Sequence, residues 1–218
     1  MFPTVLRVGL ARQVGAAIVL LAWLMTAVRA VWQGVPPDAD RQRVYFANHG
    51  SNGDFVLIWS VLPPPMRRRT RPVAGADYWL TTGLRRFVGC DVFDAVLVDR
   101  NTETRTADPM AAILAALDTG ASLILFPEGT RNTTDERLLP FKSGLYNLSV
   151  ARPEVDLIPT WIENLNAVMP KGRSIPIPLL CTVTFGAPLR AEENEDRHVF
   201  LARAQAALLA LAPESPVS

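Results

Sequence analysis

The sequence predicts an α/β fold: a mixed or largely parallel central sheet flanked by helices, with an N-terminal membrane-associated helix. Short apolar runs rich in β-branched residues alternate with amphipathic stretches of helical period. Residues 14–28 carry no charge, which marks a separate apolar helix at the front of the chain. Of the 218 residues 49% are hydrophobic and 20% are charged, and this balance excludes intrinsic disorder.

The length suits one domain with a short appendage, and such a chain buries enough surface to fold without a disulfide or a metal. The formal net charge is +1, so no basic field predicts a nucleic-acid partner. Cys90 and Cys181 stand in no metal-ligand spacing and are expected to be reduced core residues. We expect an anchor or re-entrant helix within residues 1–35 and a main domain over residues 36–212; the oligomeric state stays open.

The uncharged segment 14–28 is the first expected helix. As a helix it spans about 22 Å, less than the ~30 Å hydrocarbon core of a bilayer. Adding residues 29–32, with Arg29 snorkelling to the headgroups, brings it near spanning length. A membrane-embedded anchor is favoured over a signal peptide cleaved near residue 30 and over a buried core helix. Basic residues flank both ends, so charge gives no orientation.

A basic segment follows the run of prolines at 63–65. It contains four arginines, namely Arg67, Arg68, Arg69 and Arg71. Beside an apolar anchor, such a segment is expected at anionic lipid headgroups. A solvated loop is the alternative.

The middle and end of the chain predict alternating strands and helices. Expected strands cover residues 43–47, 94–98, 122–126, 155–162 and 179–185. One helix is expected to begin with Asp54 as its cap and to stop at Pro63. A second begins at Asp108-Pro109 and ends at Gly120. The last helix has an apolar face formed by Phe200, Ala204, Ala207, Leu208 and Leu211.

The first chemical motif is N-H-G-S-N-G-D at residues 48–54, directly after the first strand of the main domain. Its glycines let the loop fold back, so that Asp54 can reach one imidazole nitrogen of His49. That contact would fix the tautomer and leave the other nitrogen as a general base. The alternative is a structural histidine followed by a capping aspartate.

The second motif is F-P-E-G-T-R at residues 126–131, after the most apolar strand. Arg131 can present a bidentate fork to a phosphate, and Glu128 can accept hydroxyls or orient the arginine. Arg100 also follows a strand, and Lys142 lies in F-K-S-G. Ligand sites in α/β folds collect at the carboxyl ends of strands, so we expect these residues to meet.

These motifs resemble the glycerolipid acyltransferases typified by lysophosphatidic acid acyltransferase. The blocks N-H-x-S-x-x-D and F-P-E-G-T-R are met at residues 48–54 and 126–131. The block G-x-x-F-I-D-R is met in part at 94–100, F-K-x-G is met at 141–144, and an apolar block with a central proline stands at 157–162. Many members carry a lysine pair in V-A-K-K, where residues 73–77 here are V-A-G-A-D.

The resemblance implies an acyltransferase domain at 36–212 that moves a fatty acyl group from acyl-CoA or acyl-carrier protein to a lysolipid hydroxyl. The foremost acceptor is 1-acyl-glycerol 3-phosphate, which would give phosphatidic acid. His49 would be the base and Asp54 its orienting partner. Substrate binding would fall to Arg100, Glu128, Gly129, Thr130, Arg131 and Lys142. The resemblance implies no metal or cofactor, membrane lipids as partners, and a cytoplasmic membrane location with the active site on the cytosolic side.

Other acceptors stay open: a lyso-ornithine or other aminolipid, glycerol 3-phosphate, or a lysophospholipid. A rival from another class is a serine lipid hydrolase, because residues 49–53 fall one glycine short of the nucleophile motif G-x-S-x-G around Ser51. That reaction would need the remote His198 as its base. A catalytically inactive lipid-binding module is the third alternative.

Overall fold

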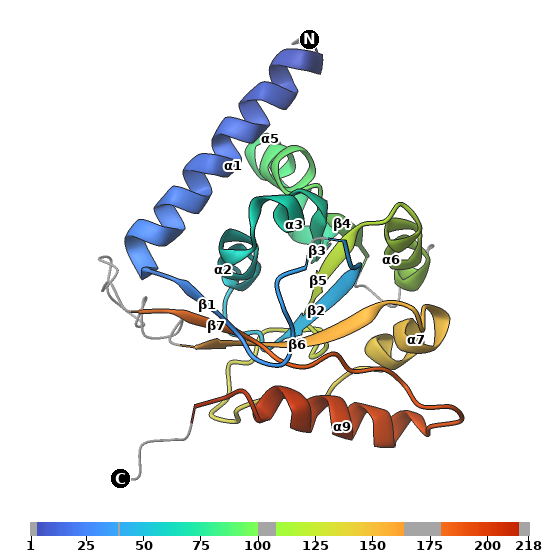
Figure 1. The fold of residues 1–218 in the computed structure, drawn as a ribbon. Helices are drawn as coiled ribbons and strands as arrows, with labels where there is room; N and C mark the ends of the chain where they lie inside the picture. The colour runs from blue at the N-terminus through green and yellow to red at the C-terminus, as the bar shows by residue number, and fades with distance from the viewer. Residues whose placement is uncertain (1–3, 39, 100–107, 164–179, 214–218) are drawn as a thin grey trace.

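The computed structural model describes residues 4–38, 40–99, 108–163 and 180–213. Its described strands form one sheet in the order β1-β7-β6-β2-β5-β3-β4 (Figure 1). The strands are β1 (Arg29–Trp32), β2 (Arg43–Ala47), β3 (Thr70–Gly75), β4 (Val96–Val98), β5 (Ser122–Leu125), β6 (Asp156–Glu163) and β7 (Thr182–Phe185). The pair β6–β7 is antiparallel and the other pairs are parallel. The prediction of a mixed, largely parallel sheet is confirmed.

Helices cover both faces of the sheet (Figure 1). The described helices are α1 (Thr4–Thr26), α2 (Asp54–Val61), α3 (Pro64–Arg69), α4 (Ala76–Trp79), α5 (Gly83–Arg86), the π-helical turn η1 (Phe87–Val92), α6 (Pro109–Asp118), α7 (Gly144–Ala151) and α9 (Arg197–Leu209). Strand β2 is buried throughout. Tyr45 and Ala47 pack in the core beneath α2, and Val44 and Phe46 pack against α6, α7 and α9. Burial on both faces explains the continuous apolar runs.

Two predicted helices are confirmed with their end signals. The Asp108 carboxylate accepts the Met110 N–H in front of α6, Pro109 is the first helical residue, and Gly120 follows the helix with φ +80°. Helix α9 buries Phe200, Ala204 and Leu208 of its predicted apolar face.

Other expectations were wrong in detail. Gly53 precedes α2, whereas Asp54 is its first residue and turns its carboxylate back to the preceding loop. The strand expected from residue 94 begins at Val96, because Asp94 has φ +48° and breaks the extended backbone. Strand β3 was not predicted. Residue 179 of the last expected strand lies outside the described residues.

Residues 29–32 do not prolong the apolar helix. They form edge strand β1, which pairs with β7. Helix α1 instead begins earlier than predicted, at Thr4, and its 23 residues span about 34 Å. Within it, Leu6–Thr26 is long and apolar enough to cross a membrane. Strand β1 lies inside the region assigned to the anchor, so that region also contributes to the sheet; the boundary at residue 35 stays a prediction.

Helix α1 lies along the domain with one face turned to it. Ala11 and Thr26 are buried, and Ile18 and Val19 pack against the core beneath α2. Only 11% of the most apolar 18-residue stretch of α1 is buried, which contradicts the alternative of a buried core helix. The opposite face is exposed and carries Leu6, Leu10, Leu20, Leu21 and Leu24.

The arginine-rich segment is not a solvated loop, because it forms helix α3 and bonds to its surroundings. Arg67 donates to the carbonyls of Trp59, Ser60 and Leu62 at 3.0, 2.7 and 2.9 Å. Arg69 donates to the Gly120 carbonyl at 3.0 Å and Arg71 to the Asp94 carbonyl at 2.6 Å. These hydrogen bonds satisfy main-chain carbonyl groups at the C-terminal ends of α2 and α6 and in the turn before β4.

Arg43, at the start of β2, carries a buried positive charge beside the Tyr45 side chain. Its side chain is 1% exposed, and its three guanidinium nitrogens have no hydrogen-bond partner in the described part of the chain. Burial raises the pKa of the nearby Tyr45 to about 12, against the opposing effect of Arg43. Burying a charged group without hydrogen bonds costs stability.

We therefore expect Arg43→Met to stabilise the protein by about 1–4 kcal/mol, as found when apolar residues replace buried ionic groups. Urea unfolding followed by circular dichroism measures this change. Arg41→Met is the matched control, because Arg41 is a mostly exposed partner of Asp156 at 3.0 Å; its loss is expected to cost below ~1 kcal/mol. A less stable Arg43→Met protein would show that the guanidinium is compensated.

Candidate active site

The two motif loops meet at one edge of the sheet, as predicted. Strands β2 and β5 are parallel neighbours, so the loops that follow them start side by side. The Asn132 N–H donates to the His49 carbonyl at 2.6 Å, which ties the second loop to the first. The Lys142 N–H donates to the Pro127 carbonyl at 2.8 Å and brings in the F-K-S-G segment.

His49 and Asp54 form a hydrogen-bonded pair. The Nδ1 atom of His49 lies 2.9 Å from Oδ2 of Asp54, which also accepts the N–H groups of Gly50 at 2.8 Å and Ser51 at 2.9 Å. The Asp54 side chain is 2% exposed. Since a carboxylate only accepts, Nδ1 carries a proton, and in the neutral imidazole Nε2 then has the lone pair. This is the arrangement that the N-H-x-x-x-x-D spacing predicts for a general base.

The imidazole ring is fixed from a second direction. The Phe126 ring stacks on it with a centroid separation of 4.1 Å and an interplanar angle of 16°. The His49 side chain remains 15% exposed, so one part of the ring can meet a substrate. The ring orientation, the main chain and the donor nitrogen of His49 are therefore set by the protein itself, an arrangement that suits base catalysis.

Glu128 positions the His49 main chain. One of its carboxylate oxygens accepts the His49 N–H at 2.9 Å and the other accepts the Leu139 N–H at 2.8 Å. Burial raises the pKa of Glu128, and the two N–H groups act against that rise. Both oxygens are already engaged with the main chain, so the role that the geometry supports is positioning. That Glu128 also binds a head group stays a prediction.

A cavity of about 350 Å³, here called the His49 cavity, opens beside the ring. Its wall is largely apolar and aromatic, with Phe55, Tyr78, Trp79, Ile113, Leu125 and Phe126. Lys142 contributes a positive charge. Gly129 makes room for it: a Cβ there would lie 2.7 Å from Lys142 Cδ, and φ is +69°. The positive φ favours glycine here, and the missing Cβ leaves the space that the end of the Lys142 side chain occupies.

A second cavity of about 400 Å³, here called the acidic cavity, borders His49 on the other side of the loop. Asp135, Glu136 and Glu163 line it together with Arg137. The Arg137 guanidinium lies 5.7 Å from the centre of the Trp161 ring.

The structure brings together five of the predicted site residues: His49, Asp54, Glu128, Gly129 and Lys142. Thr130 and Arg131 are exposed and line neither cavity. Arg100 lies outside the described residues.

Sequence reasoning missed Tyr78 and Trp79 of α4, which line the His49 cavity. Their aromatic pair stands directly after the V-A-G-A-D departure. Within the described residues, no group of three or more His, Cys, Asp or Glu side chains is arranged to hold a metal ion.

The serine-hydrolase alternative lacks its base. The Ser51 hydroxyl accepts the Gly53 N–H at 3.2 Å, which is a turn contact. His198 is exposed in the first turn of α9, and its Nε2 lies 3.4 Å from Arg197. The described structure therefore gives Ser51 no histidine to activate it.

Comparison with known proteins identifies the family. The acyltransferase family matches residues 34–163, more than half of the chain and both motif loops. The chain belongs to the acyltransferase family. The resemblance inferred from the motifs is thereby confirmed.

Similar acyltransferases are known from bacteria and plants. The chain is 31% identical over 138 residues to 1-acyl-sn-glycerol-3-phosphate acyltransferase of Salmonella typhimurium, a match that covers 59% of this chain and 51% of that protein. A protein of the same name from Cocos nucifera is 24% identical over 168 residues, covering 74% and 50%. The chain thus spans about half the length of these curated relatives.

The fold of this acyltransferase-family chain also has a solved counterpart. The 1-acyl-sn-glycerophosphate (LPA) acyltransferase PlsC from Thermotoga maritima matches with a TM-score of 0.65 and 20% identity. The match covers 93% of this chain and 77% of that one. At this identity the comparison establishes the fold.

The engagement of both Glu128 oxygens separates a positioning role from a head-group role. We expect Glu128→Gln to lower kcat and thermal stability, because an amide accepts only one of the two N–H groups and leaves the other unsatisfied, at about 1–3 kcal/mol. The acceptor KM should hardly change. Steady-state kinetics and thermal unfolding measure these quantities.

Glu154→Gln is the control for Glu128→Gln, because Glu154 is exposed in the turn before β6. It should leave kcat and stability unchanged. A raised acceptor KM for Glu128→Gln, with unchanged stability, would instead assign Glu128 to the head group.

Proposed function

We propose that this protein transfers a fatty acyl group from a thioester donor to the hydroxyl of a lysolipid, with 1-acyl-glycerol 3-phosphate as the acceptor and phosphatidic acid as the product. The observation that carries the proposal is the hydrogen-bonded His49–Asp54 pair, with Nδ1 and Oδ2 2.9 Å apart and with His49 lining the largely apolar His49 cavity. Membership of the acyltransferase family and similarity to 1-acyl-sn-glycerol-3-phosphate acyltransferases support it.

In the proposed reaction, Nε2 of His49 takes the proton of the lysolipid hydroxyl while the hydroxyl oxygen attacks the thioester carbonyl carbon. The new C–O bond forms, the C–S bond breaks, and the imidazolium returns its proton to the departing thiolate. Asp54 stabilises the imidazolium and keeps Nδ1 protonated throughout. The acceptor is itself the nucleophile, so no acyl-enzyme and no cofactor is needed.

The walls of the His49 cavity support a lipid acceptor with a phosphate. Aromatic and aliphatic side chains suit an acyl chain, and their burial against it is favourable in proportion to area. Lys142 places an ammonium in the same cavity, over Gly129, where a phosphate can bind. The donor is acyl-CoA or acyl-carrier protein.

We further propose that the protein is membrane-associated with its site on the cytosolic side, where both donors occur. Helix α1 keeps one face against the domain and exposes an apolar face to its surroundings. A helix with such an exposed apolar face, long and apolar enough to cross a membrane, suits contact with the acyl chains of a bilayer. Acceptor and product would then reach the site without crossing water.

One observation favours a second acceptor class. The acidic cavity borders His49 and is lined by Asp135, Glu136 and Glu163. Such a lining suits the ammonium of an aminolipid, such as a lyso-ornithine lipid, better than it suits a phosphate. Competition between the two acceptor types in one assay distinguishes them.

The catalytic pair yields the first kinetic prediction. His49→Ala should lower kcat by about 10²–10⁴-fold, because the base is lost. Asp54→Asn should cause a similar loss, because its amide would face N–H donors and disturb the tautomer. Ser51→Ala is the matched control and should keep substantial activity, since its hydroxyl only accepts a turn N–H. Circular dichroism confirms the fold of each variant.

The rival reaction gives the opposite pattern in that experiment. An inactive Ser51→Ala protein, together with labelling of Ser51 by a serine-reactive probe, would establish the hydrolase and overturn the transferase proposal.

Lys142 yields the second kinetic prediction. Lys142→Ala should lower kcat/KM for a phosphate-bearing lysolipid about 10- to 100-fold, the usual worth of a charged hydrogen bond to an anion. The donor KM and the kinetics with a phosphate-free lysolipid should change little. Arg197→Ala is the control, because Arg197 is an exposed cation in the first turn of α9.

The same assay on Arg131→Ala tests the head-group role that the family motif implies. Equal losses with phosphate-bearing and phosphate-free acceptors for Lys142→Ala would contradict a phosphate contact at this lysine.

A further inference from the structure

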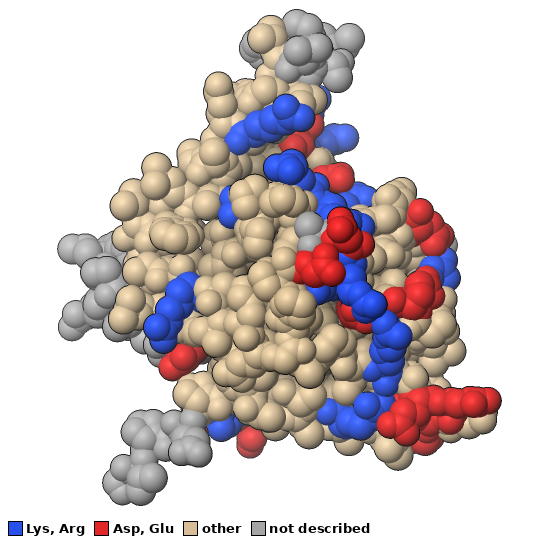
Figure 2. Space-filling view, in the orientation of Figure 1, with Lys and Arg blue, Asp and Glu red and all other residues tan. Residues whose placement is uncertain are grey.

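A cleft of about 750 Å³ lies between α1, α3 and residues 91–94, apart from the His49 cavity. We call it the α1 cleft. Two aspartates and five arginines line it; the arginines are Arg7, Arg12, Arg67, Arg68 and Arg71. Figure 2 shows basic side chains gathered on the part of the molecule formed by α1 and the neighbouring helices. The cleft is therefore strongly cationic in a protein with a net charge of only +1.

The two aspartates neutralise only part of this charge. Arg7 pairs with Asp91 at 2.7 Å, and Arg71 pairs with Asp94 at 3.1 Å. Arg67 meets main-chain carbonyls and lies 5.4 Å from the centre of the Trp59 ring, and burial lowers its pKa. Its charge is held without a carboxylate partner among the described residues.

Two further cations remain available. Arg12 on α1 and Arg68 on α3 are exposed and have no hydrogen bond or ion pair within the described part of the chain. They belong to different elements that border the same cleft. An anion bound there would meet two unpaired guanidinium groups and a field already made positive by Arg67.

The remaining wall of the α1 cleft is apolar. Ala11, Gly15 and Ala16 form its α1 side, and Trp59 and Phe93 form its floor. Gly15 faces the side chains of Val92 and Trp59, which a Cβ there would meet at 3.4 and 3.5 Å, in ordinary van der Waals contact. This wall runs along the helix whose outer face is apolar and exposed.

We infer that the α1 cleft binds one anionic phospholipid of the membrane, with its phosphate between Arg12 and Arg68 and an acyl chain along the apolar wall of α1. Charge complementarity selects an anionic head group, and the adjoining apolar wall selects a lipid over a free phosphate. The bound lipid would hold α1 against α3 and η1 and so fix the orientation of the domain on the membrane.

The α1 cleft is separate from the His49 cavity. An aromatic cluster of Trp59, Phe93, Phe55 and Trp79 stands between them, with Phe93 4.8 Å from Phe55 and 5.1 Å from Trp59 by ring centroids. The inference does not depend on the proposed acyl transfer, and its test uses binding as the readout.

The test titrates the full chain, in a neutral detergent, with dihexanoyl-phosphatidylglycerol below its micelle concentration and follows the thermal unfolding midpoint. Ligands that bind only the folded state raise this midpoint in a saturable manner. We expect a rise with phosphatidylglycerol and little rise with equal concentrations of dihexanoyl-phosphatidylcholine or inorganic phosphate.

Variants locate the binding. Arg12→Glu/Arg68→Glu should weaken the apparent affinity at least about 10-fold, whereas the matched control Arg86→Glu/Arg197→Glu, with the same change in net charge outside the cleft, should not. Ala16→Trp should also weaken it, by filling the apolar wall without a change of charge. Lys142→Ala should leave the affinity unchanged and so exclude the His49 cavity as the site measured.

Four results would overturn the inference. Equal stabilisation by inorganic phosphate would reveal a simple anion site, and equal stabilisation by phosphatidylcholine would remove the role of charge. An equal loss of affinity in the Arg86→Glu/Arg197→Glu control would show that overall surface charge, and not the α1 cleft, determines binding. Unchanged affinity in both the Arg12→Glu/Arg68→Glu and the Ala16→Trp proteins, with their unfolding midpoints intact, would place the lipid elsewhere.

Discussion

The contact between the loop after β2 and the loop after β5 is the constraint on which the site depends. Parallel pairing starts both loops at one sheet edge; the Glu128 carboxylate then accepts the His49 N–H, and the Asn132 N–H donates to the His49 carbonyl. A buried carboxylate is costly unless it is hydrogen-bonded. The N–H groups of His49 and Leu139 offset this cost, and the bond from His49 also holds the main chain of that residue, so stability and positioning of the base have one origin.

The parts of the fold that the sequence could predict are those with local signals. Asp108-Pro109 and Gly120 delimit α6, and the spacing of His49 and Asp54 predicts a contact between residues five apart. The apolar run at β5 predicts burial on both faces. In each case, one short segment contains all the residues on which the prediction depends.

What could not be predicted depends on distant partners. Strand β1 forms because it pairs with the edge of β7, about 150 residues later in the chain. The sequence of residues 29–32 contains no local signal for that pairing. The sequence predicts that the basic segment 67–71 contacts lipid or solvent, yet Arg67 and Arg69 of α3 and Arg71 of β3 bond to carbonyls of other segments. The motif predicts that Glu128 binds substrate, because it does not contain the residues at 49 and 139 whose N–H groups donate to the Glu128 carboxylate.

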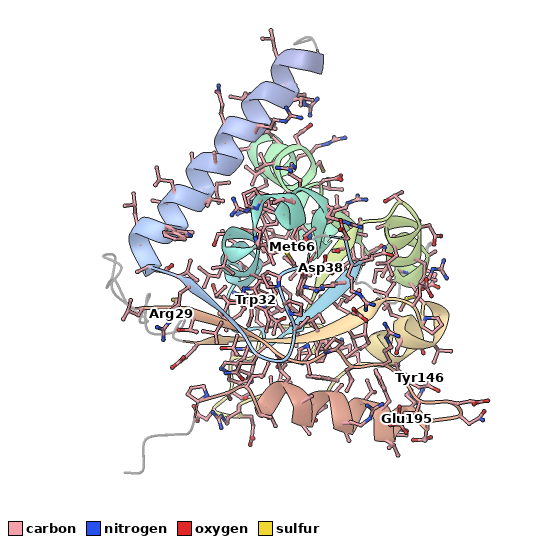
Figure 3. The ribbon with its side chains drawn as sticks, viewed as in Figure 1. Arg29, Trp32, Asp38, Met66, Tyr146 and Glu195 are labelled. Carbon is pink, nitrogen blue, oxygen red and sulfur yellow. The ribbon has the colours of Figure 1, made fainter. Side chains whose placement is uncertain are left out.

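The position of helix α1 is set by its direct connection to the sheet. It continues through residues 27 and 28 into β1, so the segment that offers an apolar face outward is covalently part of the sheet (Figure 3, where Arg29 and Trp32 mark the junction). Trp32 stacks on Phe185 of β7 with ring centroids 4.1 Å apart, which anchors the junction. This junction and the contacts of α1 with α2 and η1 fix the helix on the domain, so the direction in which its exposed leucine face points is set by the fold.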